Sequence, residues 1–114
     1  GEVANLFMNA GIITITAFVS PFKNDREKVK QIIGPEDFIE IYCAASLEVC
    51  EARDTKGLYK KARSGEINDF TGISSPYEIP KEPNIVVETG TLDIEKSVKQ
   101  IIDYLIQMDY LVDK

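Results

Sequence analysis

The chain lacks histidine and tryptophan altogether, and it has only two cysteines among its 114 residues. Without histidine, neither a Ser-His-Asp triad nor a Cys-His catalytic pair can form within this sequence. Two cysteines are too few for a disulfide framework, and a zinc site of the Cys/His type has no histidine to complete it. Because Cys43 follows an apolar run and Cys50 falls on the inner face of a predicted helix, we expect both to be buried in a reduced, cytoplasmic protein.

Long apolar runs and an excess of positive charge are also missing. No stretch approaches the roughly 18 apolar residues of a membrane-spanning helix, and the N-terminus shows neither the basic region nor the cleavage site of a secretion signal. The net charge of -6 would repel a phosphate backbone, so we expect neither a membrane nor a nucleic acid as partner. With 44% hydrophobic residues, the chain is predicted to form a single domain over residues 1–114.

Hydrophobic periodicity predicts helices that alternate with strands. The first helix has no N-cap, so the chain is expected to begin in mid-helix, and the last carries an apolar stripe that would cover a sheet face. The expected caps of the later helices are Asn24 or Asp25, Ser46, and Thr91 or Asp93. This alternation is typical of an α/β fold with a mainly parallel sheet. We expect helices over 2–10, 24–33, 47–53 and 94–108, and strands over 12–18, 38–43 and 85–89.

One long segment between the second and third expected strands is charged and has almost no strand-forming character. Connections of this length inside a domain are more often lids or binding loops than linkers, and residues 54–79 are therefore interpreted as a lid with a helical centre near 58–64. Its cations would suit phosphate or sulfate oxygens, although a solvated surface is the alternative. They are Lys56, Lys60, Lys61 and Arg63.

Three further residues are candidates for contact with a ligand. Ser20 follows the first expected strand, where open parallel sheets bind ligands, although it would also suit a simple turn. Arg53 ends the helix after the second strand and could stack on a base or bind a phosphate, the alternative being a surface salt bridge. Phe70 lies in a polar loop, where it would stack on a ligand ring or pack the lid onto the body.

Three blocks of sequence resemble the adenylylsulfate kinase (APS kinase) family. They are FVSPF at 18–22, LEVCEARDTKGLYKKARSGEI at 47–67 and FTGISSPYE at 70–78. The resemblance implies a three-layer α/β fold of the P-loop kinase type. It also implies transfer of the ATP γ-phosphoryl group to the 3′-hydroxyl of adenylylsulfate, which yields PAPS in sulfate assimilation with ATP and Mg²⁺. A homodimer and a fusion to, or association with, ATP sulfurylase are compatible with the family.

The resemblance also assigns roles to individual residues. Ser20 corresponds to a substrate-contacting serine that is described as a phosphoserine site in bacterial members. Arg53 corresponds to an arginine against the ATP adenine, and Phe70 to an aromatic residue stacked on the adenine of adenylylsulfate. The remaining assignments are Val19, Lys56 and Asp69 to the adenylylsulfate site, and Lys60, Lys61 and Arg63 to the mobile lid.

The sequence departs from the family pattern in one major way. The phosphate-binding loop, G-x-x-x-x-G-K-[ST], is absent, since no Gly-Lys pair occurs anywhere in the chain. We therefore interpret the chain as the C-terminal part of such a kinase, lacking its N-terminal strand and P-loop. The Mg²⁺ ligands are expected in that missing part, no metal ligand is assigned here, and the chain alone is expected to be inactive. Ala44 and Ser74 replace aspartates that are usual in the family.

Two other functions are compatible with these motifs. One is a non-catalytic regulatory module that binds PAPS or adenylylsulfate within a sulfate-activating enzyme. Its weakness is that a regulatory domain has no need of a basic lid and of Ser20. The other is a different nucleoside-phosphate kinase of similar fold, which the FTGISSPYE block disfavours.

Overall fold

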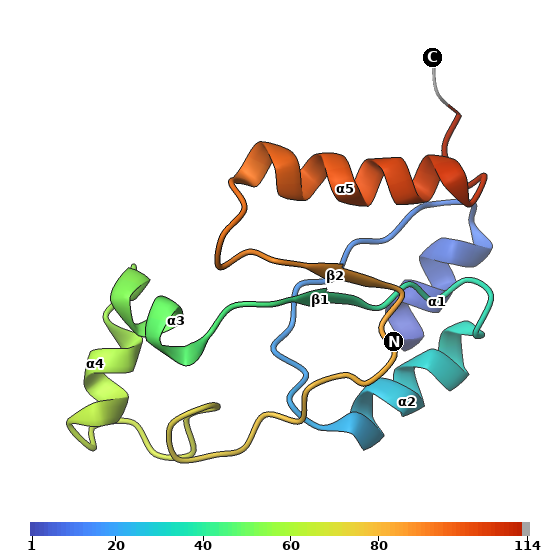
Figure 1. The fold of residues 1–114 in the computed structure, drawn as a ribbon. Helices are drawn as coiled ribbons and strands as arrows, with labels where there is room; N and C mark the ends of the chain where they lie inside the picture. The colour runs from blue at the N-terminus through green and yellow to red at the C-terminus, as the bar shows by residue number, and fades with distance from the viewer. Residues whose placement is uncertain (113–114) are drawn as a thin grey trace.

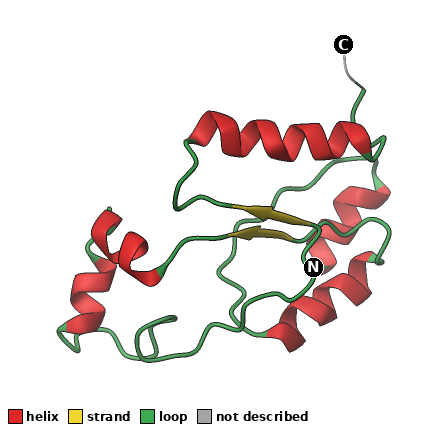
Figure 2. Ribbon diagram, viewed as in Figure 1, coloured by secondary structure: helices red, strands yellow, loops and turns green. Residues whose placement is uncertain are grey.

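The structure, a computed structural model, describes residues 1–112 and has helices on both sides of a parallel pair of strands. In Figure 1, α5 lies on one side of the strand pair and α2 on the other, and Figure 2 shows how much of the chain is loop. The predicted α/β class with a parallel sheet is therefore confirmed. The elements are α1 (Glu2–Asn9), α2 (Lys23–Ile33), β1 (Ile41–Cys43), α3 (Leu47–Arg53), α4 (Leu58–Arg63), β2 (Ile85–Val87) and α5 (Ile94–Gln107).

The two strands pair in parallel, with Ile41 opposite Ile85. Both run toward α3 and α4, so their carboxyl ends reach the same edge of the sheet (Figure 1). Backbone hydrogen bonds continue past the strands, from Ala44 N to Val87 O at 2.8 Å and from Gly90 N to Ala44 O at 3.0 Å. The two loops that leave the sheet are thereby joined at the edge where parallel sheets bind ligands.

The apolar core of the described residues is small. Only Ala62, Ile85 and Val87 are buried among the hydrophobic side chains of residues 1–112, and Val87 is the most enclosed at 1% exposure. Side chains alternate along β2, so Val86 between the two buried residues faces outward at 41% exposure. The core therefore depends on β2 and on the elements packed against it.

The apolar stripe of α5 is covered only in part. The helix packs against β2, and Ile101 and Leu105 are half-buried, whereas Ile94 is 82% exposed and Val98 is 51% exposed. A two-stranded sheet is narrow compared with the apolar face of a helix this long. The prediction that the whole stripe covers a sheet face is wrong at these outer positions. None of the helices in residues 1–112 has the length and apolar character needed to cross a membrane.

Residues 12–18 do not form the buried strand that their sequence predicts. They cross from α1 toward α2 as an irregular, exposed segment (Figure 1), in which Ile15 is 91% and Phe18 is 79% exposed. In the described part of the chain, residues 13–19 make no backbone–backbone hydrogen bond. A strand exists only when a neighbour accepts and donates its ladder bonds, and this segment pairs with neither β1 nor β2.

Two smaller expectations also fail. Helix α2 begins at Lys23 after Phe22, and neither Asn24 nor Asp25 caps it, because both lie inside its first turn. Cys43 is exposed, not buried, although it pairs with the buried Val87 of the neighbouring strand, and Cys50 is only half-buried.

The expected caps of two other helices are confirmed. The Ser46 hydroxyl accepts from Val49 N at 3.4 Å at the start of α3, and the Asp93 carboxylate accepts from Lys96 N at 2.8 Å at the start of α5. These hydrogen bonds are local, and the backbone N–H groups of a first helical turn have no partner within the helix. Local sequence patterns therefore indicate these two caps, whereas the cap of α2 comes from outside its local sequence.

Asp54, which directly follows α3, caps the N-terminus of α4 with its side chain. Its carboxylate oxygens accept from Tyr59 N and Lys60 N, each at 3.0 Å. Desolvation raises the pKa of Asp54, but hydrogen bonds from the backbone of α4 outweigh it, so the pKa lies below its ordinary value. The charged carboxylate thus holds α4 in place directly after α3.

The buried face of β2 is expected to carry more of the stability than its exposed face. Val87→Ala should lower the free energy of unfolding by about 2 kcal/mol, because it removes buried methyl groups and leaves a cavity. Val86→Ala on the same strand is the matched control and should have a much smaller effect. Urea denaturation of both variants measures the difference, and equal losses would contradict the core described here.

Asp54 should make α4 sensitive to acid. Because its folded-state pKa is lowered, its contribution is present above the unfolded pKa near about 4 and is lost as the pH falls through the folded value. Amide hydrogen exchange should show protection of Tyr59 and Lys60 falling in that range. In Asp54→Asn the protection should lose this pH dependence, whereas Asp103→Asn on α5 should leave it as in the wild type. A wild-type profile that matches that of Asp54→Asn at every pH would refute the cap.

Candidate functional site

The carboxyl edge of the sheet brings α3 back onto the loop after β2. Arg53, at the end of α3, donates from Nη2 to Gly90 O at 3.4 Å. Gly90 packs beside Ala45, since a Cβ on Gly90 would lie 3.5 Å from Ala45 Cα, at ordinary van der Waals distance. The Thr89 hydroxyl also donates to Ala44 O at 3.1 Å. The predicted adenine-contacting arginine therefore lies at the edge where a ligand is expected, held by backbone and not by a carboxylate.

Helices α3 and α4 are joined by charge as well as by Asp54. Arg63 of α4 contacts Oε1 of Glu51 through Nη2 at 2.5 Å and through Nε at 3.0 Å. Of the four predicted lid cations, Arg63 is therefore paired with a carboxylate of the neighbouring α3. The other three, Lys56, Lys60 and Lys61, are exposed and make no ion pair within residues 1–112. They are available to phosphate or sulfate oxygens.

Phe70 packs on α4. Its ring meets that of Tyr59 edge to face, with centroids 5.0 Å apart. Burial raises the pKa of the Tyr59 hydroxyl, and a hydrogen bond with Cys50 raises it further. Tyr59 and Phe70 both belong to lid segment 54–79, so this contact packs the segment on itself, and the two alternatives for Phe70, stacking on a ligand ring or packing the lid onto the body, both stay predictions. An edge-to-face contact uses part of the ring surface only, so it does not exclude a stacked ligand.

The backbone around Phe70 forms a tight loop. Phe70 N donates to the Ser74 hydroxyl at 2.9 Å, and Phe70 O accepts from Ser75 N at 3.1 Å. Asp69 adopts a φ of 55°, in the left-handed region that an aspartate tolerates better than most residues. Asp69 is exposed, so its carboxylate is accessible at the mouth of this loop. The loop fixes the position of Phe70 relative to its own neighbours.

Ser20 is the most constrained of the predicted site residues. It has a φ of 41°, which is unfavourable for a residue with a Cβ, and such conformations cluster at ligand sites. The side chain is half-buried, whereas the preceding Val19 is 63% exposed. The Ser20 carbonyl accepts from Arg26 Nη1 at 2.7 Å. Sequence reasoning missed Arg26, because nothing local in α2 indicates a contact with the turn before the helix.

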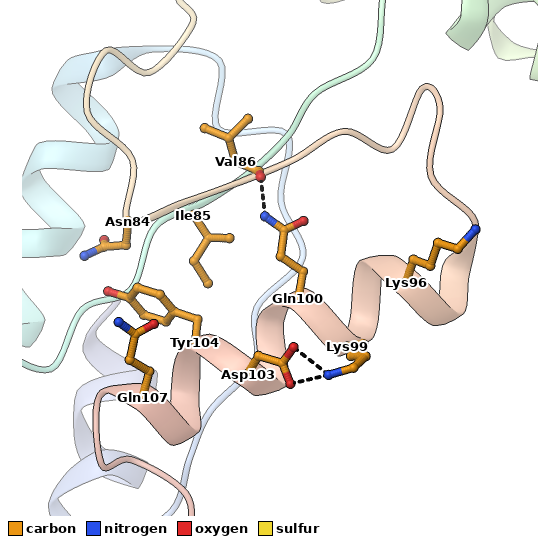
Figure 3. A pocket seen from close by; sticks show the side chains of 9 residues that line it. All are labelled: Asn84, Ile85, Val86, Lys96, Lys99, Gln100, Asp103, Tyr104 and Gln107. Atoms are coloured by element: carbon orange, nitrogen blue, oxygen red, sulfur yellow. Dashed lines mark hydrogen bonds and ion pairs between the residues drawn. The ribbon is translucent and has the colours of Figure 1, made fainter.

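One hollow among the described residues lies elsewhere. It has a volume of about 490 Å³ and is formed by β2 and α5 (Figure 3), where Gln100 Nε2 donates to Val86 O at 2.8 Å. Lys99 and Asp103, one turn apart on α5, both line the hollow and form an ion pair with each other. No residue that the sequence predicts for the site lines it. Within residues 1–112 there is also no cluster of three or more His, Cys, Asp or Glu side chains placed to hold a metal ion.

The predicted residues therefore fall into two groups. Arg53, Arg63 and Phe70 lie on or against the α3–α4 pair at the carboxyl edge of the sheet. Ser20 lies in the turn before α2 and is joined to the end of the lid segment through Glu78, whose N–H donates to Pro21 O at 2.8 Å. Among the described residues, no hydrogen bond or ion pair joins Ser20 directly to Arg53, Arg63 or Phe70.

Comparison with known proteins gives the family. The model of the adenylylsulphate kinase family matches residues 1–88. The chain is 59% identical over 109 residues to an adenylyl-sulfate kinase of Prochlorococcus marinus and 63% identical over 105 residues to one of Acaryochloris marina. These matches cover 96% and 92% of this chain but 54% and 51% of the relatives, so the chain spans about half the length of the curated relatives it matches.

A solved structure agrees with the sequence comparison. The Mycobacterium tuberculosis APS kinase, solved in complex with AMPPNP and APS, superposes with a TM-score of 0.85 at 39% identity, over 90% of this chain and 60% of that one. The fold is therefore that of the APS kinases, and the family that the three sequence blocks predict is confirmed. The chain belongs to the adenylylsulphate kinase family.

Proposed function

We propose that this chain is the acceptor-binding and lid part of an adenylylsulfate kinase. The observation that carries the proposal is its identity of more than half to proteins named adenylyl-sulfate kinase, over nearly its whole length. The mycobacterial structure supports it, because that protein was solved with an ATP analogue and APS. The exposed cations of the lid segment and the strained turn at Ser20 add physical support.

The proposed reaction joins the 3′-oxygen of adenylylsulfate to the γ-phosphorus of ATP. The bond between that phosphorus and the β,γ-bridging oxygen breaks, the hydroxyl proton is lost, and the products are PAPS and ADP. Such transfers depend mainly on positioning and on stabilisation of charge. In this proposal Phe70 stacks on the adenine of adenylylsulfate, with Lys56 and Asp69 beside it, and Ser20 and Val19 contact the same nucleotide.

The ATP side of the reaction is shared with residues outside this chain. Arg53 is proposed to lie against the ATP adenine, and Lys60, Lys61 and Arg63 to close over both nucleotides. Arg63 would first have to leave Glu51. The 114 residues contain no Gly-Lys pair and hence no phosphate loop, so we assign the phosphate cradle and the Mg²⁺ ligands to the part of the kinase that the relatives have beyond the matched region.

Compartment and assembly are also proposals. Cys43 and Cys50 are free thiols, which favours a reducing compartment such as the cytoplasm. Within the described residues, nothing favours a homodimer or an association with ATP sulfurylase over a single chain, so both stay predictions from the family resemblance.

The function is tested by incubating the full-length protein that carries this sequence with MgATP and adenylylsulfate, and by measuring PAPS and ADP. Equal amounts of both products are expected. ADP without PAPS, or no product at all, would contradict the kinase. Saturable binding of adenylylsulfate without turnover would instead identify the non-catalytic regulatory module.

Phe70 should contribute to binding of adenylylsulfate through its ring. Phe70→Ala in the same protein is expected to weaken binding by about 1–3 kcal/mol, the usual scale of a base stacked on an aromatic side chain. Titration calorimetry measures the effect. Phe70→Tyr keeps the ring and should bind as the wild type does, and Phe7→Ala on α1 controls for the loss of an exposed phenylalanine elsewhere. If Phe70→Ala bound adenylylsulfate normally, the stacking role would be lost.

A further inference from the structure

One side chain of α2 connects three distant segments of the chain. Arg26 donates from Nη1 to Ser20 O at 2.7 Å and from Nη2 to Glu78 O at 2.8 Å. Its Nε lies 2.9 Å from Glu40 Oε1, just before β1. The side chain is 11% exposed, so the guanidinium is largely shielded from water. All three of its nitrogens are therefore engaged, one with each segment.

Glu78 strengthens the same junction from the other side. Its Oε2 accepts from Lys23 N at 2.6 Å, which supplies the N-terminal cap that α2 lacks locally. Its own N–H donates to Pro21 O at 2.8 Å. A carboxylate at a helix N-terminus is favoured by the free N–H groups and by the helix dipole. The carboxyl end of lid segment 54–79 is thus held on the turn that carries Ser20.

Tyr77, next to Glu78, also attaches the end of the lid segment to the body of the domain. Tyr77 stacks on Tyr42 of β1, with ring centroids 6.2 Å apart and planes inclined by 20°. Burial raises the pKa of the Tyr77 hydroxyl, in agreement with a ring that is partly removed from water. The end of the lid segment is therefore seated on β1 as well as on α2.

Glu40 needs a positive charge at position 26, and the two carbonyl contacts favour an arginine as its source. Glu40 Oε1 is buried, and within the described residues it accepts no hydrogen bond, because the Arg26 Nε–H close to it does not point at it in hydrogen-bond geometry. The positive charge of Arg26 is what balances this carboxylate. A lysine would keep the charge but could not reach two carbonyls in fixed directions at the same time.

Ser20 depends on this support. Its positive φ is unfavourable for a residue other than glycine, and such a backbone persists only where its surroundings hold it. The bond from Arg26 fixes its carbonyl, whereas Pro21 favours an extended backbone at this position and so makes the observed conformation harder to hold. Without Arg26 the turn is free to relax, which would move the Ser20 side chain.

We propose that Arg26 is a positioning residue for the acceptor nucleotide, because it holds the Ser20 turn and the end of the lid segment at a fixed separation. The inference rests on the proposed function, in which Ser20 lies on one side of adenylylsulfate and the lid segment supplies Phe70 and Lys56 on the other. Arg26 does not touch the nucleotide in this account. Its loss should affect adenylylsulfate and not ATP, whose proposed contacts lie on α3, on α4 and outside this chain.

The kinetic test uses Arg26→Lys in the full-length protein, with adenylylsulfate and ATP varied separately. The KM for adenylylsulfate should rise about tenfold or more, the scale of one lost hydrogen bond from a charged donor. The KM for ATP should stay within about twofold of the wild type, since one hydrogen bond in α2 reaches no proposed ATP contact. Lys28→Gln is the matched control, because Lys28 is an exposed cation of the same helix, paired only with Asp25, and it should change neither constant.

A second variant and a structural measurement separate positioning from loss of folding. Glu78→Ala leaves the pair of Arg26 and Glu40 intact. It should raise the KM for adenylylsulfate by less than Arg26→Lys does, and it should likewise leave the KM for ATP unchanged. Hydrogen exchange in Arg26→Lys should increase in peptides that cover 17–23 and 74–80 and stay unchanged in α5. A merely structural role would instead raise exchange throughout and lower kcat at constant KM.

The possible failures are distinguishable. A wild-type protein that makes no PAPS would overturn the proposed function and the acceptor role of Arg26 with it. An active wild type whose Arg26→Lys variant has an unchanged KM for adenylylsulfate would overturn the inference alone. Equal increases in both KM values would also overturn it, because the effect would then lack selectivity for the acceptor.

Discussion

Parallel pairing of β1 with β2 brings most of the segments that carry candidate site residues to one edge of the sheet. The register of Ile41 with Ile85 directs both strands to the same edge, where the loops after Cys43 and Val87 are joined by backbone hydrogen bonds. Helix α3 begins at that edge, and its last residue, Arg53, returns to the loop after β2. If the strands were antiparallel, these two loops would leave opposite ends of the sheet, and the site would not form.

Lid segment 54–79 is held at both ends by charged groups. At its start, the Asp54 carboxylate binds the first turn of α4, and at its end Glu78 is bound by Arg26 and by the N-terminus of α2. Between these anchors lie the exposed cations and Phe70. A segment fixed at its ends can change shape in the middle without losing its place, which is what closure over a ligand requires. Release of Arg63 from Glu51 is the step in this region most open to such a change.

Local features were predictable from the sequence, and features that depend on distant partners were not. Ser46, Asp93 and the helix at α4 follow from residues that lie within a turn of one another, so their patterns indicate the observed structure. Residues 12–18 have the composition of a buried strand, but composition does not say whether a neighbouring strand is present to pair with it. The contact of Arg26 with Glu78 spans 52 positions and leaves no periodic signal. The motifs indicated the family and the candidate residues, whereas the structure shows how those residues are held.

The central claim is that adenylylsulfate binds between the Ser20 turn and lid segment 54–79. A crystal structure of the full-length protein with adenylylsulfate and AMPPNP tests it most directly. The account predicts that the adenine of adenylylsulfate lies against the ring of Phe70, with Ser20 and Lys56 in contact with the same molecule. Adenylylsulfate bound elsewhere, for example in the hollow between β2 and α5, would contradict it.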